Sequence, residues 1–231
     1  MESIKILSLE TSTTNCSVAV SINGETVAIK EENSENYSHA EQLHVFIDEV
    51  LKQAKIQPAE LDAIAVSKGP GSYTGLRIGV SAAKGLCFAI QIPLISVPTL
   101  QSLAFQLKNR VAEEDLIIPM LDARRMEVYS QVFSSKLSAL TKTEAKILDE
   151  SSFAEVASDK TLHFLGDGVA KFEAVSNLSQ AKFYSDKIPS AKDLGGIAFQ
   201  KFNAKEFEDV AYFEPYYLKD FVAGKPKKRF Q

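Results

Sequence analysis

The first part of the chain alternates between short apolar runs and polar turns. Residues 4–9 form an apolar run typical of a buried strand. Residues 16–22 alternate apolar and small polar side chains, as a half-buried strand does. Asn23-Gly24 then predicts a tight hairpin into a third strand over residues 25–30. The pattern therefore predicts a three-stranded meander at the start of the fold.

Helical spacing of apolar residues begins after residue 38. Ser38 and Glu41 have the spacing of a capping box, and the helix they open leaves Val45 outside its apolar stripe. The stripe comprises Leu43, Phe46, Ile47, Val50, Leu51 and Ala54. The elements predicted to follow are strands at residues 61–67 and 93–97 and helices at residues 74–90 and 98–110. This order predicts a mixed sheet with helices on its faces.

The polar run Glu113-Glu114-Asp115 is the predicted boundary between two domains, residues 1–112 and residues 113–231. Beyond it the order of elements partly restarts. The predicted elements are strands at 116–122, 127–134, 145–148 and 162–165, a helix near 152–158, and a last helix opened by Ser190 and Asp193. We expect a second lobe that is smaller and less regular than the first, with its last helix packing back on the first lobe.

The helix predicted over residues 74–90 is apolar or small on nearly every side, and Arg77 and Lys84 are its only charged residues. A helix of this kind is normally covered all round. Its small residues are Gly75, Gly79, Ala82, Ala83 and Gly85, which permit the close approach of another helix. We interpret the helix as a protein interface with a charged rim. The alternative is that Arg77 and Lys84 are two snorkelling side chains at a domain edge.

Residues 68–76 form a glycine-rich loop from a strand into this helix. The Lys-Ser or Lys-Thr of a P-loop is missing, and Gly69, Gly71 and Gly75 do not have dinucleotide-fingerprint spacing. Backbone N–H groups at a helix start favour an anion. Glycines also serve tight turns and close packing, so both interpretations stay open. The hydroxyl-rich turn at residues 10–15 is equally compatible with phosphate binding or a simple turn.

Composition narrows the classes of function. The chain has 231 residues, 45% hydrophobic and 24% charged, which is typical of a soluble globular protein. A net charge of −4 gives no general attraction to nucleic acid. The basic residues 225–229 are interpreted as a solvated end, with RNA contact as the alternative. Cys16 and Cys87 lie in apolar runs, so we expect buried, reduced thiols in a cytoplasmic protein. No signal peptide or membrane helix is predicted.

Catalytic and metal-binding residues are not predicted. Glu10 ends the first strand, where a nuclease-type fold places a metal-binding carboxylate. That chemistry needs two or three converging carboxylates, and the matching strand end offers Ser67 and Lys68 instead. His39 and His44 are five residues apart, which is poor helical geometry for zinc.

Four segments together resemble the TsaB family, also called YeaZ. They are residues 7–12, 38–41, 68–77 and 121–129, and residues 213–218 resemble that family's ending. The resemblance covers the whole chain. It implies an α/β protein with the two-lobed actin, sugar-kinase and Hsp70-like (ribonuclease H-like) fold, with a mixed sheet and flanking helices in each lobe.

The resemblance also implies a function. Such a chain is a non-catalytic relative of the transferase TsaD and pairs with a TsaD-like protein and the ATPase TsaE. The complex places a threonylcarbamoyl group on adenosine 37 of tRNA, so the chain meets tRNA only through the complex. Homodimers are expected when the chain is free. No cofactor is required by the chain alone, although the resemblance allows ATP or ADP at the surface shared with TsaD.

Two departures from TsaD support a non-catalytic role. TsaD carries a pair of metal-binding histidines separated by three residues, where this chain has Thr99 and Leu103. Neither side chain replaces an imidazole ligand. The second lobe's turn, glycine-rich in TsaD, here contains Arg124 and Arg125. The alternative function is an autonomous small-molecule kinase or ATPase of the same superfold, which requires two complete phosphate turns and a carboxylate that binds Mg²⁺.

The resemblance predicts two sets of site residues. The expected partner-binding residues are Val45, Tyr73, Arg77, Val80, Ala83, Lys84 and Cys87. The expected phosphate-contacting residues are Thr11, Ser12, Gly69, Gly71 and Ser72.

Overall fold

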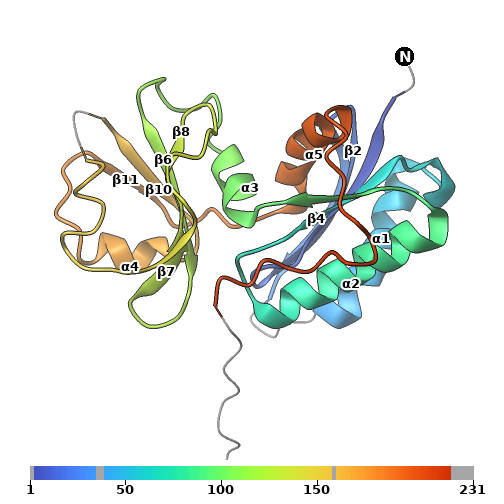
Figure 1. Cartoon of the computed structure of the whole chain (residues 1–231), viewed down its shortest axis with the longest axis horizontal. Helices are drawn as coiled ribbons and strands as arrows, with labels where there is room; N and C mark the ends of the chain where they lie inside the picture. The colour runs from blue at the N-terminus through green and yellow to red at the C-terminus, as the bar shows by residue number, and fades with distance from the viewer. Residues whose placement is uncertain (1–2, 35–38, 158–159, 220–231) are drawn as a thin grey trace, which may run out of the picture.

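Two β-sheets, each with its own helices, make up the chain (Figure 1). The computed structural model describes residues 3–34, 39–157 and 160–219. The predicted helix cap at Ser38, the end of the predicted helix at Ser158 and the basic residues 225–229 lie outside the described residues.

The first sheet has the strand order β3-β2-β1-β4-β5. Its strands are β1 (Lys5–Glu10), β2 (Asn15–Ile22), β3 (Glu25–Asn33), β4 (Ala63–Ser67) and β5 (Leu94–Val97). β1, β2 and β3 form the predicted meander, whereas β4 and β5 run parallel to β1. The central strand β1 therefore ends beside β4, and the turn that follows β1 lies close to the loop that follows β4.

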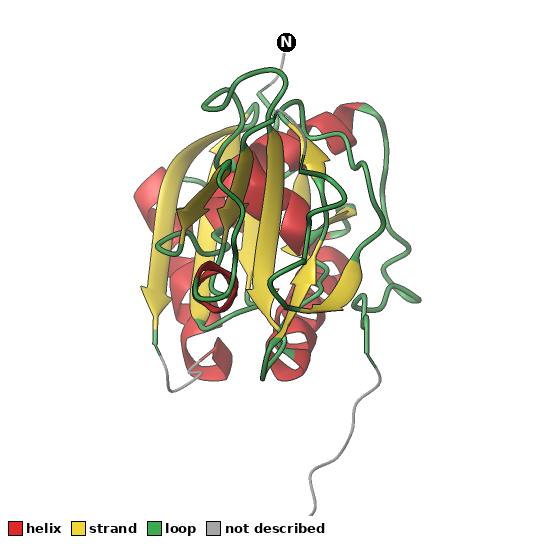
Figure 2. Cartoon of the chain, turned by 90° about the vertical axis from the view of Figure 1, so that its left-hand side faces the viewer, coloured by secondary structure: helices red, strands yellow, loops and turns green. Residues whose placement is uncertain are grey.

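The second sheet repeats this plan in the order β9-β7-β6-β10-β11. Figure 2 views the molecule from the side of this sheet. Its strands are β6 (Leu116–Asp122), β7 (Glu127–Ser130), β9 (Glu144–Ile147), β10 (Leu162–Leu165) and β11 (Ala181–Tyr184), with β8 (Phe133–Ser134) pairing with β6. β6 pairs antiparallel with β7 and parallel with β10, as β1 does with β2 and β4.

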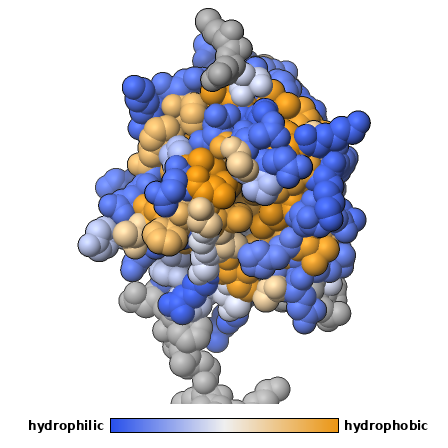
Figure 3. All heavy atoms as spheres, turned by 90° about the vertical axis from the view of Figure 1, so that its right-hand side faces the viewer, coloured by the Kyte–Doolittle hydropathy of each residue, from blue (hydrophilic) through white to orange (hydrophobic). Residues whose placement is uncertain are grey.

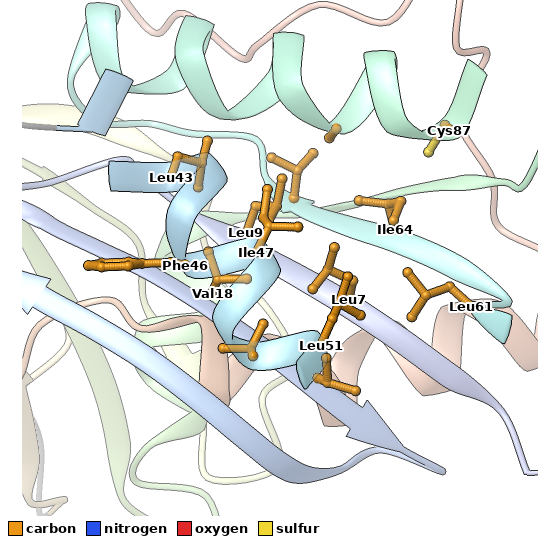
Figure 4. Packing of buried hydrophobic residues seen from close by; sticks show 14 of the residues in the cluster. Leu7, Leu9, Val18, Leu43, Phe46, Ile47, Leu51, Leu61, Ile64 and Cys87 are labelled. Carbon is orange, nitrogen blue, oxygen red and sulfur yellow. The ribbon is translucent and has the colours of Figure 1, made fainter. Parts of the chain in front are cut away.

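The first sheet is covered on both faces. Helices α1 (His39–Ala54) and α2 (Tyr73–Ile90) cover one face, and α5 (Leu194–Asn203) covers the other. In α1 the buried apolar side chains are Leu43, Phe46, Ile47, Val50 and Leu51, which with the partly buried Ala54 form the stripe that helical spacing predicts. Figure 4 shows Leu43, Phe46, Ile47 and Leu51 of this stripe. Two short 3₁₀ turns, η1 (Pro58–Glu60) and η2 (Ala191–Asp193), precede β4 and α5.

The lobes exchange helices. The second sheet packs one face on an aromatic cluster that includes α4 (Val169–Glu173), and the other on α3 (Thr99–Phe105). Helix α3 thus comes from the first half of the chain but packs on the second sheet, and α5 comes from the second half but packs on the first. The boundary between residues 112 and 113 stays a prediction.

Several predicted elements differ from those observed. Helix α3 ends at Phe105 rather than near residue 110, and the strand predicted over 127–134 is split into β7 and β8. Residues 150–156 form turns rather than a helix, and β11 was not predicted. β11 is short and only half-buried, so its sequence lacks a clear apolar pattern. Within the described residues, none of the helices combines the length and apolar character needed to cross a bilayer.

Candidate partner-binding groove and inter-lobe cleft

The glycine loop between β4 and α2 packs directly against the turn that joins β1 to β2. The Ser72 N–H donates to the Ser12 carbonyl at 2.6 Å, and the Thr11 hydroxyl donates to the Gly75 carbonyl at 2.8 Å. The Ser72 hydroxyl caps α2 by accepting from the Gly75 N–H at 3.3 Å. The loop and turn residues predicted to contact phosphate are therefore brought together, and they contact one another.

Close approach of main chains explains the glycines in this loop. A Cβ on Gly71 would lie 2.4 Å from the Ser12 carbonyl oxygen, and one on Gly75 would lie 2.0 Å from that of Thr11. Both distances are far below van der Waals contact, so no larger residue fits without a backbone shift. The packing interpretation of the loop thus accounts for its glycines, while phosphate contact stays a prediction.

Glu10 lies under this turn with its side chain completely buried. One carboxylate oxygen accepts from the Ser12 N–H at 2.7 Å, and the other has no partner in the part of the chain that is described. Burial raises the pKa of the Glu10 carboxyl and so favours its neutral form. A neutral carboxyl is a poor metal ligand. Among residues 3–34, 39–157 and 160–219, no three His, Cys, Asp or Glu side chains form a cluster that could hold a metal.

A cleft of about 920 Å³ lies between the lobes. The β1–β2 turn and the glycine loop line one side, and residues 216–219 complete the lining. The other side is lined by residues 121–125, Glu127, Tyr129 and Asp167. Arg124 and Arg125 are exposed at the cleft, and both have positive φ, at 71° and 49°. The Arg124 N–H donates to a carboxylate oxygen of Asp122 at 2.5 Å, which holds the turn in this shape.

A second, shallow groove of about 540 Å³ runs between α1 and α2 on the outside of the first lobe. Its lining is largely apolar or small and comprises Ala40, His44, Arg77, Ile78, Ser81, Ala82, Gly85 and Leu86. Two large apolar side chains of these helices are exposed, Val45 at 52% and Phe88 at 74%. Apolar side chains also gather on the face of the molecule seen from the right-hand side of Figure 1, with polar residues around them (Figure 3).

Three of the predicted partner-binding residues point into the core of the first lobe rather than toward solvent. Val80, Ala83 and Cys87 are at most 3% exposed and belong to the core beneath α2. Figure 4 shows Cys87 pointing from α2 into this core. Their burial follows from the helical period, because these positions share one face of α2 with Leu76. Burial also raises the pKa of the Cys87 thiol to about 12. The exposed face of α2 instead carries Arg77, Ser81, Gly85 and Phe88. Because both faces contain small residues, the sequence pattern does not distinguish the exposed face from the buried one.

Val45, Tyr73, Arg77 and Lys84 are the predicted partner-binding residues that the core does not bury. Arg77 and Lys84 nevertheless contact their own chain. The Lys84 ammonium donates to the Ala211 carbonyl at 3.1 Å and to the Phe213 carbonyl at 2.9 Å. These contacts fasten the strap, which we define as residues 208–219, along α2 (Figure 1).

Arg77 contacts the strap at a second point, nearer to the cleft. Its guanidinium lies 4.2 Å from the centroid of the Tyr73 ring and donates to the Tyr217 hydroxyl at 3.1 Å. The two tyrosine rings lie 4.8 Å apart. Tyr217 was not predicted as a site residue, because nothing in the local sequence indicates a contact with a helix 140 residues earlier.

Thr99 and Leu103 occupy structural positions. Both side chains are fully buried. The Thr99 hydroxyl lies 2.7 Å from that of Ser67 and accepts from the Gly69 N–H at 3.1 Å. Leu103 packs in the core between α3 and the second sheet. Thr99 thus fixes the start of the glycine loop, and Leu103 joins a helix to a sheet.

The sequence comparisons with known proteins all point to tRNA threonylcarbamoyladenosine synthesis. A family model described as TsaD, tRNA N6-adenosine threonylcarbamoyltransferase, matches residues 32–226. The chain is 28% identical to the tRNA threonylcarbamoyladenosine biosynthesis protein TsaB of Escherichia coli, over 96% of this chain and 97% of that protein. It is 30% identical to the TsaB of Buchnera aphidicola from Schizaphis graminum, over 85% of this chain and 93% of the relative. The match to Haemophilus influenzae TsaB is 36% identical but spans 59% of this chain and 57% of that protein.

The fold agrees with these sequence matches. The solved structure of YeaZ from Pseudomonas aeruginosa superposes with a TM-score of 0.82 at 25% identity, covering 93% of this chain and all of that one. The two mixed sheets with flanking helices agree with the α/β fold that the sequence predicted for each lobe.

Proposed function

Because the chain belongs to the TsaB (YeaZ) family of proteins that act in tRNA threonylcarbamoyladenosine biosynthesis, we propose that it is the non-catalytic partner of a TsaD-like transferase. In this proposal the transferase, assisted by TsaE, modifies adenosine 37 of tRNA in the cytoplasm. The chain stabilises the transferase and meets tRNA only through it. The surface that the two proteins share is the proposed site for any ATP or ADP.

The observation that carries this proposal is the open groove between α1 and α2. Small residues such as Ala82 and Gly85 allow a partner helix to approach closely, and the exposed side chains of Val45 and Phe88 add apolar surface on the same two helices. Exposed apolar surface next to a smooth groove is typical of protein interfaces. The helix-in-groove mode buries such a surface against an amphipathic partner helix.

The cores of the two lobes support a non-catalytic role. Thr99 and Leu103 stand where the resemblance places the metal-binding histidines of TsaD, and both are used for packing. The buried Glu10 carboxyl, whose pKa is raised, is poorly suited to bind Mg²⁺. The alternative of an autonomous kinase or ATPase therefore lacks a supporting observation at the β1–β2 turn.

Reconstitution of tRNA modification tests the proposal. A TsaD-like enzyme, TsaE, threonylcarbamoyl-AMP and an unmodified tRNA are assayed with and without this chain. We expect the modification rate to depend on the chain, and the chain alone to modify no tRNA and turn over no ATP. Modification that proceeds equally well without the chain would refute the role. ATP turnover by the chain alone that is lost in Glu10→Ala would instead favour the autonomous enzyme.

We also propose that the free chain forms homodimers through the same groove. A groove that is open in the isolated chain exposes apolar surface, which association would bury. Sedimentation analysis should then show dimers that the TsaD-like partner converts into heterodimers. Homodimers that persist unchanged while the partner binds would place the two contacts on different surfaces.

A further inference from the structure

The strap crosses the molecule from the outer edge of the first sheet to the second lobe (Figure 1). At its start, Glu208 pairs with Leu94 of the edge strand β5, with its N–H donating to the Leu94 carbonyl at 2.8 Å. Beyond the Lys84 contacts, the Tyr216 N–H donates to the Lys68 carbonyl at 2.7 Å. The strap is thus fastened to the first lobe by repeated backbone hydrogen bonds.

The end of the strap reaches the second lobe. Lys219 forms an ion pair with Glu127 of β7, and its ammonium lies 5.9 Å from the centroid of the Tyr129 ring. The side chains of this pair are 41% and 21% exposed. Ion pairs of this exposure are weak and are screened by salt. The strap is therefore held firmly on one lobe and loosely on the other, and residues 216–219 line the cleft between them.

Arg77 takes part in both the α1–α2 groove and the inter-lobe cleft. Its side chain lines the α1–α2 groove, and the same guanidinium holds Tyr217 in the cleft. Cation–π and hydrogen-bond contacts of an exposed arginine are individually modest, so a partner in the groove can compete for them. A partner that takes the guanidinium of Arg77 withdraws it from Tyr217, which stands two residues before Lys219.

We propose that the strap is a latch that holds the two lobes together across the inter-lobe cleft, and that Arg77 couples this latch to occupation of the α1–α2 groove. An empty groove leaves Arg77 on Tyr217 and Lys219 on Glu127. A protein partner in the groove releases first Tyr217 and then the Lys219 end, and the lobes separate. The coupling rests on the proposed function, which names the occupant of the groove, whereas the latch concerns the chain alone.

Distances between spin labels on the two lobes test the latch. Gln53→Cys on α1 and Ala174→Cys beside α4 provide exposed sites, while Cys16 and Cys87 are buried with thiol pKa values of about 12 and should label slowly. Lys219→Ala and Glu127→Gln should shift the distribution to longer distances, changing the ratio of latched to released molecules by up to about five-fold. Lys182→Ala removes an exposed lysine of β11 and should change nothing. A distribution in Lys219→Ala identical to that of the parent protein would overturn the latch.

The coupling has its own variants. Arg77→Ala should lengthen the distances as Lys219→Ala does, although Arg77 lies on the first lobe. Adding the TsaD-like protein to the doubly labelled parent should do the same. An unchanged distribution in Arg77→Ala, or partner binding without any change in distance, would overturn the coupling. A partner that fails to bind would overturn the proposed function and the coupling with it, but would leave the latch result standing.

Discussion

The two lobes share one strand plan but differ in the surfaces they build on it. In the first lobe, the long helices α1 and α2 cover the sheet and leave an open groove between them. In the second, the helix α4 has five residues, and the corresponding face is filled by an aromatic cluster. The turns after the central strands differ as well. Main-chain contacts with the glycine loop hold the first turn, whereas Arg124 and Arg125 project from the second.

This difference separates folding from function within one architecture. A mixed sheet with a helix on each face satisfies the backbone and the core in both lobes. The first lobe adds a smooth helical surface that its own core does not need, and the second does not. We infer that partner binding is a property of helices α1 and α2 rather than of the fold.

The largest expected effect distinguishes the two faces of α2. The side chain of Ala83 is fully buried in the first lobe's core, so Ala83→Glu places a carboxylate there. We expect a loss of about 5 kcal/mol or more in unfolding free energy, because no partner for the charge lies in that apolar cluster. Gly85→Glu introduces the same side chain two residues later, where a Cβ meets open space. Thermal unfolding should show a large drop in Tm for Ala83→Glu and little change for Gly85→Glu. Equal Tm values would mean that the faces are assigned wrongly.

A large-to-small substitution in the aromatic cluster of the second lobe tests whether the lobes are separate cores. Phe172 is fully buried, with ring centroids 5.3 Å from Phe153 and 4.9 Å from Phe164. Phe172→Ala should lower the stability of that lobe by about 3–5 kcal/mol. Hydrogen exchange should then rise in β6 and β10 more than in β1 and β4. An equal rise in both sheets would show that the lobes unfold as one unit.

The junction between the lobes should respond to pH. Burial raises the pKa of Asp193 from 3.8 to about 7, while hydrogen bonding from Gln106 and the charge of Lys192 oppose this shift. The Gln106 amide also donates to the Ile188 carbonyl at 2.8 Å. Since the folded-state pKa is raised, the stability that this group contributes is full below about pH 4 and is lost as pH rises through 7. Three pKa units correspond to at most about 4 kcal/mol.

Asp193→Asn provides the check on this assignment. Asparagine retains an oxygen that accepts from Gln106 and does not ionise. Between pH 4 and pH 8, urea denaturation of the variant should lose less stability than that of the parent protein. The same pH dependence in both proteins would assign it to other groups, of which buried Glu10 is the first to examine.

The smallest expected effect is a gain in stability at the groove. Gly85 lies inside α2 with open space around its missing Cβ, so Gly85→Ala should stabilise the helix by about 0.5–1 kcal/mol. The added methyl group also keeps a partner helix farther away. Chemical denaturation should show the gain in stability, and partner affinity should fall slightly. A gain in both stability and partner affinity would show that Gly85 is not needed for the close approach of a partner helix.

The sequence predicted the elements whose pattern is local. The meander and the buried stripe of α1 follow from periods of two and 3.6 residues. The buried face of α2 is harder to assign from sequence. Gly79 packs against Thr11 and Gly85 faces open space, but the two glycines look alike in the sequence. The exchange of α3 and α5 between the lobes depends on long-range packing that no local pattern records.

Long-range contacts also explain what the sequence missed in the candidate site. Arg77 and Lys84 were predicted at the rim of an interface, which their place on α2 suggests. Their hydrogen bonds to Tyr217 and to the carbonyls of Ala211 and Phe213 join segments more than 120 residues apart. Neither the strap nor its path across the cleft follows from the composition of residues 208–219.

The affinity of a TsaD-like partner for Gly85→Glu tests the central claim most directly. This variant places a charge in the α1–α2 groove without touching the core, and Gln53→Glu adds the same charge on the exposed surface of α1. By isothermal titration, Gly85→Glu should bind at least about ten-fold more weakly than the parent protein, which corresponds to 1.4 kcal/mol, and Gln53→Glu should bind as the parent does. Equal affinity for Gly85→Glu and the parent would contradict the assignment of the groove as the partner-binding surface.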